Sequence, residues 1–414
     1  MNISASDLKI IRDVAKRIAE IAAHPRQKRT ADLWRRLNNL ERVRPMILLY
    51  DGTLHETSWK TANLLQCEGE EARGIEHGLR AEVYHWEHLR DDSVWEPVYH
   101  CHIAQEWNGW GMEQKADRPD HVFGARHFHC NIADNDEPSR IPDPVVTVDW
   151  ETTKRRHQEF SEIFDGILPV QLRGVTGHWY DPLDSFITWR GIEETFLDMV
   201  DRPQWLHGWL ERMCQNYLSR LDQYEKLNLL ALNNGNTGIG PGGLGWTDLL
   251  PQKDFDGEHV RTIDQWGHAT TQIFSEVSPA MHEEFALRYE KRFLARFGLA
   301  GYGCCEPLDL KVDLIRKHVP HLRRISMSPK ANVERGAAAC RDEVIFSYKP
   351  NPTIIGMEGW DRDLARAELR DAFEKTRGCV IEVIMKDLHS CRNQPHRMSE
   401  WVDMAMLLAE EFAS

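Results

Sequence analysis

The sequence predicts an α/β protein, and within that class a (β/α)8 barrel of the TIM type with an elaborated, partly irregular N-terminal region. In the last third of the chain, four short apolar segments alternate with helical segments, which is typical of parallel βαβ units. Further apolar segments near residues 46, 168 and 229 bring the strands towards the eight of a barrel. A length of 414 residues suffices for one such domain. The alternative is a doubly wound open sheet.

The N-terminal region is predicted to be helical over 1–40, where apolar residues recur at three- and four-residue steps. A short strand is expected at 45–50. The hundred or so residues that follow are rich in Trp, His, Asp and Pro and show little periodicity, so we expect helices and long connections that cap the barrel. The predicted organisation is one domain, 1–414, with capping insertions in 1–150 and regular barrel units in 151–414.

The regular part of the chain carries strands and helices in alternation. A long helix is expected over 279–297, where Ser278 and Pro279 start it and aromatic residues recur every four positions. The predicted strands are 167–172, 229–232, 299–304, 322–327, 344–348 and 379–385. The other predicted helices are 191–225, 308–318, 329–340, 361–376 and 395–412.

Charge and hydropathy exclude several classes of function. The chain has 51 Lys and Arg residues against 65 Asp and Glu, and this net charge of -14 argues against a nucleic-acid backbone as the main partner. No apolar run approaches the roughly 20 residues of a membrane helix, and the amino terminus is a charged amphipathic helix rather than a signal peptide. Nine cysteines without the spacing of a disulfide scaffold suit a reducing cytosol, so we expect a cytoplasmic protein.

A metal site is predicted at the carboxyl ends of the strands, where a barrel places its active site. Alternate residues of an extended strand point the same way, so Cys304 and Glu306 are expected on one face. The same rule groups Asp387, His389 and Cys391 after the last strand. Thiolate, carboxylate and imidazole groups are normal ligands of Zn²⁺. We therefore predict a mononuclear zinc site with the leading ligands Cys304, Glu306 and His389 and the reserve ligands Cys305 and Cys391. The alternative is that the cysteines are buried core residues.

A substrate pocket is expected in the loops that follow two earlier strands. The first loop contains His178, Trp179 and Tyr180, and the second contains Asn233, Asn234 and Trp246. Tryptophan side chains in loops suit stacking on a flat apolar substrate. The candidate catalytic residues are Glu306, His178 and Tyr180, and the candidate substrate-binding residues are Trp179, Asn233, Asn234 and Trp246. Ordinary loop packing is the alternative.

Four stretches of the chain carry a resemblance to a known superfamily. They are Arg44–Pro45 before the first strand, Phe274–Pro279 before the long helix, Gly301–Glu306 and Lys386–His389. On these features, and over roughly residues 30–412, the chain resembles the uroporphyrinogen decarboxylase superfamily. It looks closest to the branch of zinc-dependent methyltransferases that are linked to cobalamin or corrinoid proteins. The run Cys-Cys-Glu is the specific part, and the resemblance implies a (β/α)8 barrel with its pocket at the carboxyl ends of the strands.

The resemblance leaves two assignments of the zinc ligands open. The methyltransferase branch binds zinc through a His-x-Cys pair on one strand and a Cys on a later strand. In this chain Tyr302 stands at the His position if Cys304 is the Cys. The other assignment pairs Cys304 with Glu306 and brings His389 from the last strand.

The function that the resemblance implies is that of a zinc-dependent methyltransferase, the demethylase component of a corrinoid system. Such a protein moves a methyl group from a small methylated substrate, with methoxyaromatic compounds as one donor class, to a corrinoid protein or to folate. The chain has no Asp-x-His-x-x-Gly stretch, so cobalamin is expected on a partner corrinoid protein. The alternatives are a decarboxylase like uroporphyrinogen decarboxylase and a non-catalytic barrel that partners a corrinoid assembly. No nucleic-acid or membrane partner is expected, and a homodimer is left open.

Overall fold

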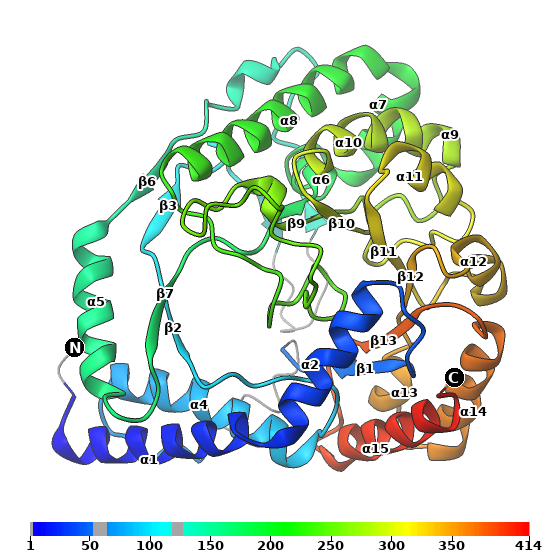
Figure 1. Ribbon diagram of the computed structural model, residues 1–414. Coiled ribbons are helices and arrows are strands. Elements are labelled where there is room, and N and C mark those ends of the chain that lie inside the picture. Colours follow the sequence, from blue (N-terminus) through cyan, green and yellow to red (C-terminus); the bar gives the residue numbers. More distant parts are fainter. Residues whose placement is uncertain (1–2, 53–63, 118–126, 414) are drawn as a thin grey trace.

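The computed structural model describes residues 3–52, 64–117 and 127–413, and its centre is a parallel sheet of seven strands (Figure 1). Every strand pair in this sheet is parallel. In spatial order the strands are β1 (Met46–Leu49), β13 (Ile381–Met385), β12 (Ile345–Tyr348), β11 (Leu322–Met327), β10 (Leu299–Tyr302), β9 (Trp266–Ala269) and β8 (Trp179–Tyr180). Parallel pairing requires crossover connections, and helices supply them here. The prediction of an α/β protein is confirmed.

The C-terminal helices follow the strands in alternation and lie outside the sheet, towards the rim of the view in Figure 1. They bury one face against the strands: α15 (His396–Glu411), for example, buries Met398, Trp401, Ala405 and Leu408. The other elements of this half are α11 (Val312–His318), α12 (Val333–Cys340), α13 (Thr353–Gly356), α14 (Arg362–Lys375) and α15 (His396–Glu411). The predicted strand at 322–327 is confirmed at both ends.

The barrel prediction is confirmed only in part. β1, the first strand, is paired with β13, the last, with Met46 opposite Glu382, as a barrel requires. Within the described residues, however, the hydrogen-bonded order ends at β1 and at β8. A separate parallel pair, β2 (Tyr99–His102) with β7 (Val170–Arg173), lies on the open side (Figure 1). The observed pairs therefore establish a parallel sheet and do not establish a closed barrel.

The N-terminal region consists of helices and short strand pairs. The helix predicted over 1–40 is two helices, because Pro25 begins the second and His24 caps it. The helices of this region are α1 (Ala5–Ala22), α2 (Pro25–Asn38), α4 (Glu70–His88), the 3-10 turn η1 (Pro138–Arg140) and α5 (Trp150–Ile163). Its short strands are β3 (Gln105–Trp107), β4 (Ala116–Asp117), β5 (His127–Phe128) and β6 (Val146–Val148).

The middle of the chain differs most from the prediction. The helix expected over 191–225 is divided at Pro203, and only Leu230 of the expected strand 229–232 makes a bridge, to Val175. Instead, β9 supplies the strand next to β10. The elements here are α6 (Pro182–Arg190), α7 (Ile192–Asp201), α8 (Pro203–Lys226), η2 (Thr262–Asp264), α9 (Pro279–His282), the π-helical turn η3 (Glu283–Leu287) and α10 (Arg288–Leu294). No helix in the described residues is long and apolar enough to cross a membrane.

Candidate functional site

Sulfur and charged side chains gather where three strands of the sheet end. β9 runs into Thr270 and Thr271, β10 runs into Gly303–Glu306, and β13 runs into Lys386 and Asp387. Gly303 has a φ of 87°, which an L side chain rarely adopts, and it turns the chain out of the strand. All three segments lie at the carboxyl edge of the sheet, where parallel α/β proteins place their active sites. This edge is the candidate active site.

The centre of the site is a pair of thiols beside a buried ammonium group. The sulfurs of Cys304 and Cys305 are 3.4 Å apart, and Nζ of Lys386 lies 3.6 Å from each. Lys386 also pairs with the carboxylate of Asp387, whose Oδ2 lies 3.9 Å from the Cys305 sulfur. Cys304 is buried, whereas Cys305 is exposed. The site therefore presents one accessible sulfur with a positive charge beside it.

The two thiols have opposite ionisation behaviour. The hydrogen bond between the sulfurs, together with the Lys386 ammonium, lowers the pKa of Cys305 to about 7. The same hydrogen bond and burial raise the pKa of Cys304 above its ordinary value, so Cys304 stays a thiol that donates to Cys305. A lowered pKa beside Lys is typical of reactive cysteines, because the thiolate is the nucleophilic form. Cys305 is thus the candidate nucleophile.

Glu306 is fully buried beside the two cysteines. Its carboxylate accepts hydrogen bonds from the Thr270 hydroxyl at 2.9 Å, from the Thr271 N–H at 3.3 Å and from the Cys304 N–H at 2.9 Å. These donors satisfy a buried carboxylate without a metal or a basic partner. Glu306 therefore fixes the turn that presents the two cysteines and joins the end of β10 to the end of β9.

A network of buried ionisable groups is connected to the site through Thr271 and Tyr302. Glu290 accepts the hydroxyls of Thr271 at 2.8 Å and Tyr302 at 2.6 Å. The Tyr302 oxygen is 2.6 Å from Nε2 of His282, and Nζ of Lys311 is 3.1 Å from Nδ1 of the same ring. Burial raises the pKa of Glu290 to about 8 and lowers the pKa of His282 to about 3. Glu290 is therefore a proton store at neutral pH, while His282 is uncharged.

Asp184, in the first turn of α6, is a further carboxyl group whose ionisation is affected by the Cys305 sulfur. One of its oxygens accepts from the Gln272 amide, and Oδ1 is buried without a hydrogen-bond partner. Burial and then the charges of Asp181, Glu306 and Cys305 raise the pKa of Asp184 to about 7. A carboxyl group that is partly protonated near neutral pH is suited to general acid–base work.

A second group of buried polar side chains lies on and directly after the strands next to the thiol pair. Arg324 and Glu382 form a buried ion pair at 3.0 Å, and Glu382 also accepts the Gly243 N–H at 3.0 Å. Lys349 donates to the Ser347 hydroxyl at 2.5 Å, and burial lowers its pKa to about 7. Arg324, Ser347 and Glu382 come from β11, β12 and β13, and Lys349 directly follows β12. Arg324 and Glu382 connect the sheet to the loop that contains Gly243.

The predicted zinc ligands do not form a set that fits the metal. In the described residues, no group of three or more His, Cys, Asp or Glu side chains is arranged to hold a metal ion. The Lys386 ammonium contacts both sulfurs, and Glu306 is saturated by its own donors. His389 is exposed and Cys391 is buried, and neither takes part in the hydrogen bonds described for these sulfurs. The zinc site stays a prediction from the sequence.

The shared-face reasoning behind that ligand set does not hold in the structure. β10 ends at Tyr302 and β13 ends at Met385, so alternation does not extend to the predicted ligands. The backbone of Asp387 has a φ of 59°, in the left-handed region, which breaks the extended conformation directly after Lys386. The side chains of 387, 389 and 391 are consequently not related by the period of two.

The predicted pocket residues His178 and Tyr180 are packed at the edge of the sheet. His178 is buried, its ring lies 4.7 Å from that of Phe297, and its Nε2 is 2.8 Å from the Gln265 side-chain oxygen. Burial lowers the pKa of His178 to about 4, so the ring is neutral. Tyr180 is fully buried with its ring 4.6 Å from that of Tyr217. Their proposed catalytic roles stay predictions, and these contacts are those of core residues.

The amide residues of the second loop bind backbone. Asn233 is buried and donates to the carbonyls of Thr176 and Trp266 at 2.9 and 3.0 Å, and it accepts the Trp266 N–H at 2.8 Å. Asn234 donates to the Leu250 carbonyl at 2.7 Å. These bonds hold the loop in place and leave the Asn233 amide little capacity for a substrate.

The two predicted tryptophans pack against other side chains. The Trp179 ring stacks on that of His268 at 4.9 Å, and the guanidinium of Arg35 lies over the ring of Trp246 at 5.7 Å. Substrate binding by either ring stays a prediction. Lys386 was predicted in the segment after the last strand but without a role, and Asp184 was not predicted. A lysine at the carboxyl end of an apolar strand was the available signal for the first.

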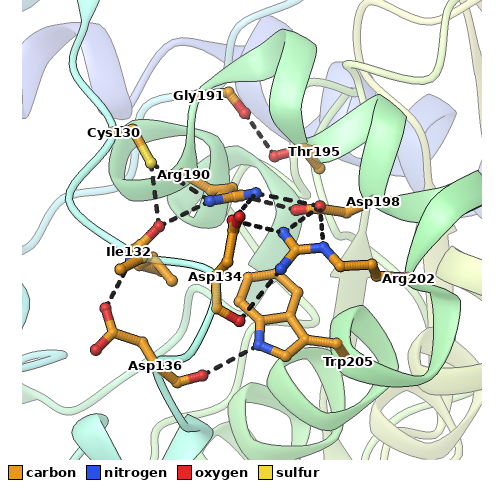
Figure 2. Close-up of polar contacts among 11 residues, drawn as sticks. Cys130, Ile132, Asp134, Asp136, Arg190, Gly191, Thr195, Asp198, Arg202 and Trp205 are labelled. Carbon is orange, nitrogen blue, oxygen red and sulfur yellow. Dashed lines mark hydrogen bonds and ion pairs between the residues drawn. The ribbon is translucent and has the colours of Figure 1, made fainter.

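A separate charged cluster joins α6 and α7 to the segment 130–136 (Figure 2). Arg190 donates to Asp198 at 2.7 Å, to Asp134 at 2.9 Å and to the Ile132 carbonyl at 2.8 Å. Arg202 pairs with the same two carboxylates, at 2.5 Å from Asp198 and 3.1 Å from Asp134. Two positive and two negative groups balance, so the cluster is a structural clamp rather than a second reactive site.

Comparison with known proteins leaves the family open. No family model matches the chain, and no curated protein matches its sequence. Among solved structures, a methyltransferase from Methanosarcina mazei has 9% sequence identity and a TM-score of 0.46, and the match covers 92% of this chain and 98% of that chain. A likeness of this degree identifies neither a family nor a reaction. What the fold and site define is an α/β protein with a thiol-centred candidate active site at the carboxyl edge of a parallel sheet.

Proposed function

We propose that the protein is a methyltransferase that takes a methyl group from a small methylated substrate, with methoxyaromatic compounds as the leading donor class. The observation that carries the proposal is the exposed Cys305 sulfur, held beside the Lys386 ammonium at 3.6 Å and beside the Cys304 thiol at 3.4 Å. The final acceptor in this proposal is a corrinoid on a partner protein, or folate. The closed barrel and the zinc ion stay predictions from the sequence and are not needed for it.

In the first half of the reaction, Cys305 is the nucleophile. Its sulfur lone pair forms the new bond to the methyl carbon, while the bond between that carbon and the donor heteroatom breaks and leaves its electron pair on the heteroatom. Asp184 supplies the proton that the heteroatom takes up, because its pKa of about 7 keeps part of the population protonated. The products of this half are the demethylated substrate and an S-methyl group on Cys305.

In the second half, Cys305 is the leaving group. The acceptor supplies an electron pair to the methyl carbon, and the sulfur–carbon bond breaks with its electrons on Cys305. A thiol of low pKa leaves more readily than an ordinary one, because its thiolate is the more stable anion. The hydrogen bond and the ammonium that lower the pKa of Cys305 therefore assist both halves of the reaction.

The test is to incubate the protein with methoxyaromatics, methylamines and thioethers, without and with a reduced corrinoid. Without an acceptor, peptide mass spectrometry should find one methyl group on Cys305. With a corrinoid, its absorbance should change as the methyl group arrives. The matched control is Cys130→Ser, since Cys130 is the exposed cysteine of the separate cluster, whereas Cys305→Ser should abolish both signals.

Two outcomes overturn the proposal. Methylation that persists in Cys305→Ser removes Cys305 from the reaction. No transfer from any donor, together with carbon dioxide release from a carboxylic acid, assigns the site to a decarboxylase.

A further inference from the structure

A cavity of about 440 Å³ lies between α4, the segment that leads into β2, and the end of β7. This volume is in the range of small-molecule sites, roughly 300–1,000 Å³. Its lining includes the side chains of Glu82, Trp95, His100 and Arg173. No function described above uses these residues, and Arg173 stands at the carboxyl end of its strand, as residues that bind ligands in parallel α/β proteins do.

Arg173 has more donors than its protein neighbours use. Its guanidinium donates to the Thr237 hydroxyl at 2.5 Å, and within residues 3–52, 64–117 and 127–413 it forms no ion pair. Burial lowers the pKa of Arg173, while the charge of Glu96, also in the cavity wall, raises it. A half-buried guanidinium with free N–H groups facing a cavity is a binding group for a planar oxyanion, since a carboxylate matches its two parallel donors.

Around Arg173 the lining has a neutral imidazole, an indole and three carboxyl groups, those of Asp51, Glu82 and Glu96. The Nδ1 atom of His100 is buried without a partner, and burial lowers the pKa of His100 to about 4, with the charge of Arg173 adding to this effect. The neutral ring therefore offers a hydrogen bond without a charge. Trp95 provides an apolar wall. Burial raises the pKa of Glu82 to about 7, so this carboxyl group is partly neutral and opposes an anion less than an ordinary glutamate.

We infer that this cavity is a binding site for the carboxylate of a small aromatic acid, with Arg173 binding the carboxylate and Trp95 contacting the ring. Carboxylate binding in this cavity is independent of methyl transfer. The further step, that the cavity anchors the methyl donor, rests on the proposed function and narrows the donor to methoxylated aromatic acids.

The cavity and the thiol site lie at neighbouring strand ends. Asp51 lines the cavity and directly follows Tyr50, whose N–H donates to the Met385 carbonyl at 2.8 Å. Lys386 follows Met385 and contacts both sulfurs of the thiol pair. One wall of the cavity is thus one strand away from Lys386, and adjacent strands are about 4.8 Å apart. The anchoring role for a methyl donor depends on this proximity between the wall at Asp51 and Lys386.

Binding of 4-methoxybenzoate to the full chain, measured by calorimetry without any methyl acceptor, tests the inference. Arg173→Gln should weaken binding by about 10- to 100-fold, because a charge-assisted bidentate contact is lost. Arg173→Lys should recover part of it. The control Arg366→Gln, in a surface ion pair of α14, should bind as the wild type does. Circular dichroism establishes that each variant is folded.

Two further probes define the ligand class. The neutral analogue 4-methoxybenzyl alcohol should bind to the wild type at least tenfold more weakly than the acid does. Its affinity for Arg173→Gln should equal its affinity for the wild type. Inorganic phosphate should not compete. Equal binding of the acid to wild type and Arg173→Gln overturns the inference, as does competition by phosphate, which assigns the site to tetrahedral oxyanions. Binding that depends on Arg173 without any methyl transfer refutes only the proposed function.

Discussion

Replacing Lys386 by Met removes the ammonium group that lies 3.6 Å from both sulfurs and keeps a side chain of similar length. At this distance two unit charges interact by about 1.2 kcal/mol at the dielectric of water and about 4.6 kcal/mol at an effective dielectric of 20. Cys305 is exposed, so solvent screening keeps the interaction near the lower end, at about 1.2–2.5 kcal/mol. This corresponds to roughly one to two pKa units.

The pKa of Cys305 should therefore rise from about 7 in the wild type to about 8–9 in Lys386→Met. The assay is the rate of iodoacetamide alkylation of Cys305 against pH, followed by peptide mass spectrometry. The midpoint of the pH profile is the appropriate readout, because a thiolate of higher pKa is also intrinsically more nucleophilic. At a single pH this greater nucleophilicity partly offsets the smaller fraction of thiolate. Cys130 in the same samples is the internal control. An unchanged midpoint refutes the role assigned to Lys386.

Three further predictions concern stability and metal binding. Burial raises the pKa of Glu290 to about 8, so the stability that protonated Glu290 contributes is fully present below its unfolded pKa of 4.5 and is lost as the pH rises through 8. Between pH 5 and pH 8, urea denaturation should show a fall of up to about 4 kcal/mol in the free energy of unfolding of the wild type, and no such fall in Glu290→Gln. The same pH dependence in both proteins contradicts this prediction. Gly243→Ala places a Cβ 2.3 Å from a buried indole and should lower the free energy of unfolding by at least about 2 kcal/mol. The control Gly235→Ala has no atom within 4 Å of the new Cβ and should lower it by less than about 1 kcal/mol, the scale of ordinary surface changes. Equal losses of stability in the two variants contradict the close packing at Gly243. Elemental analysis should find less than one zinc per chain in the wild type; stoichiometric zinc that is lost in both Cys304→Ala and Glu306→Ala establishes the zinc prediction instead.

The sequence by itself determined the class of fold, and it predicted the edge of the sheet at which the candidate site lies. The last four strands were predictable because each is a short apolar run followed by a helix with one apolar face, and both periods are local properties of the chain. The segments after β10 and β13 were predicted to lie together, because carboxyl ends of parallel strands share one edge. This is why Cys304 and Cys305, 80 residues or more before Lys386 in the sequence, were expected near the end of β13.

Strands without an apolar signal needed the tertiary structure. β9 contains Trp266, Gly267, His268 and Ala269, which show neither alternation nor an apolar run. This segment is a strand because β8 and β10 supply hydrogen bonds on both sides, and because Gly267 allows the Phe297 ring to pack closely against it. Pairing partners distant in the sequence determine such a strand, and its own residues do not.

The partners of the site residues were also decided by tertiary structure. Glu306 was expected to face a metal because a buried carboxylate needs compensation, and the compensation comes from Thr270, Thr271 and the backbone of Cys304. The left-handed backbone at Asp387 and the turn at Gly303 ended the alternation on which the zinc ligands were based. Periodicity predicts side-chain direction only while the backbone stays regular. At the ends of strands, where the candidate site lies, the direction is determined by the turn and by residues from other parts of the chain.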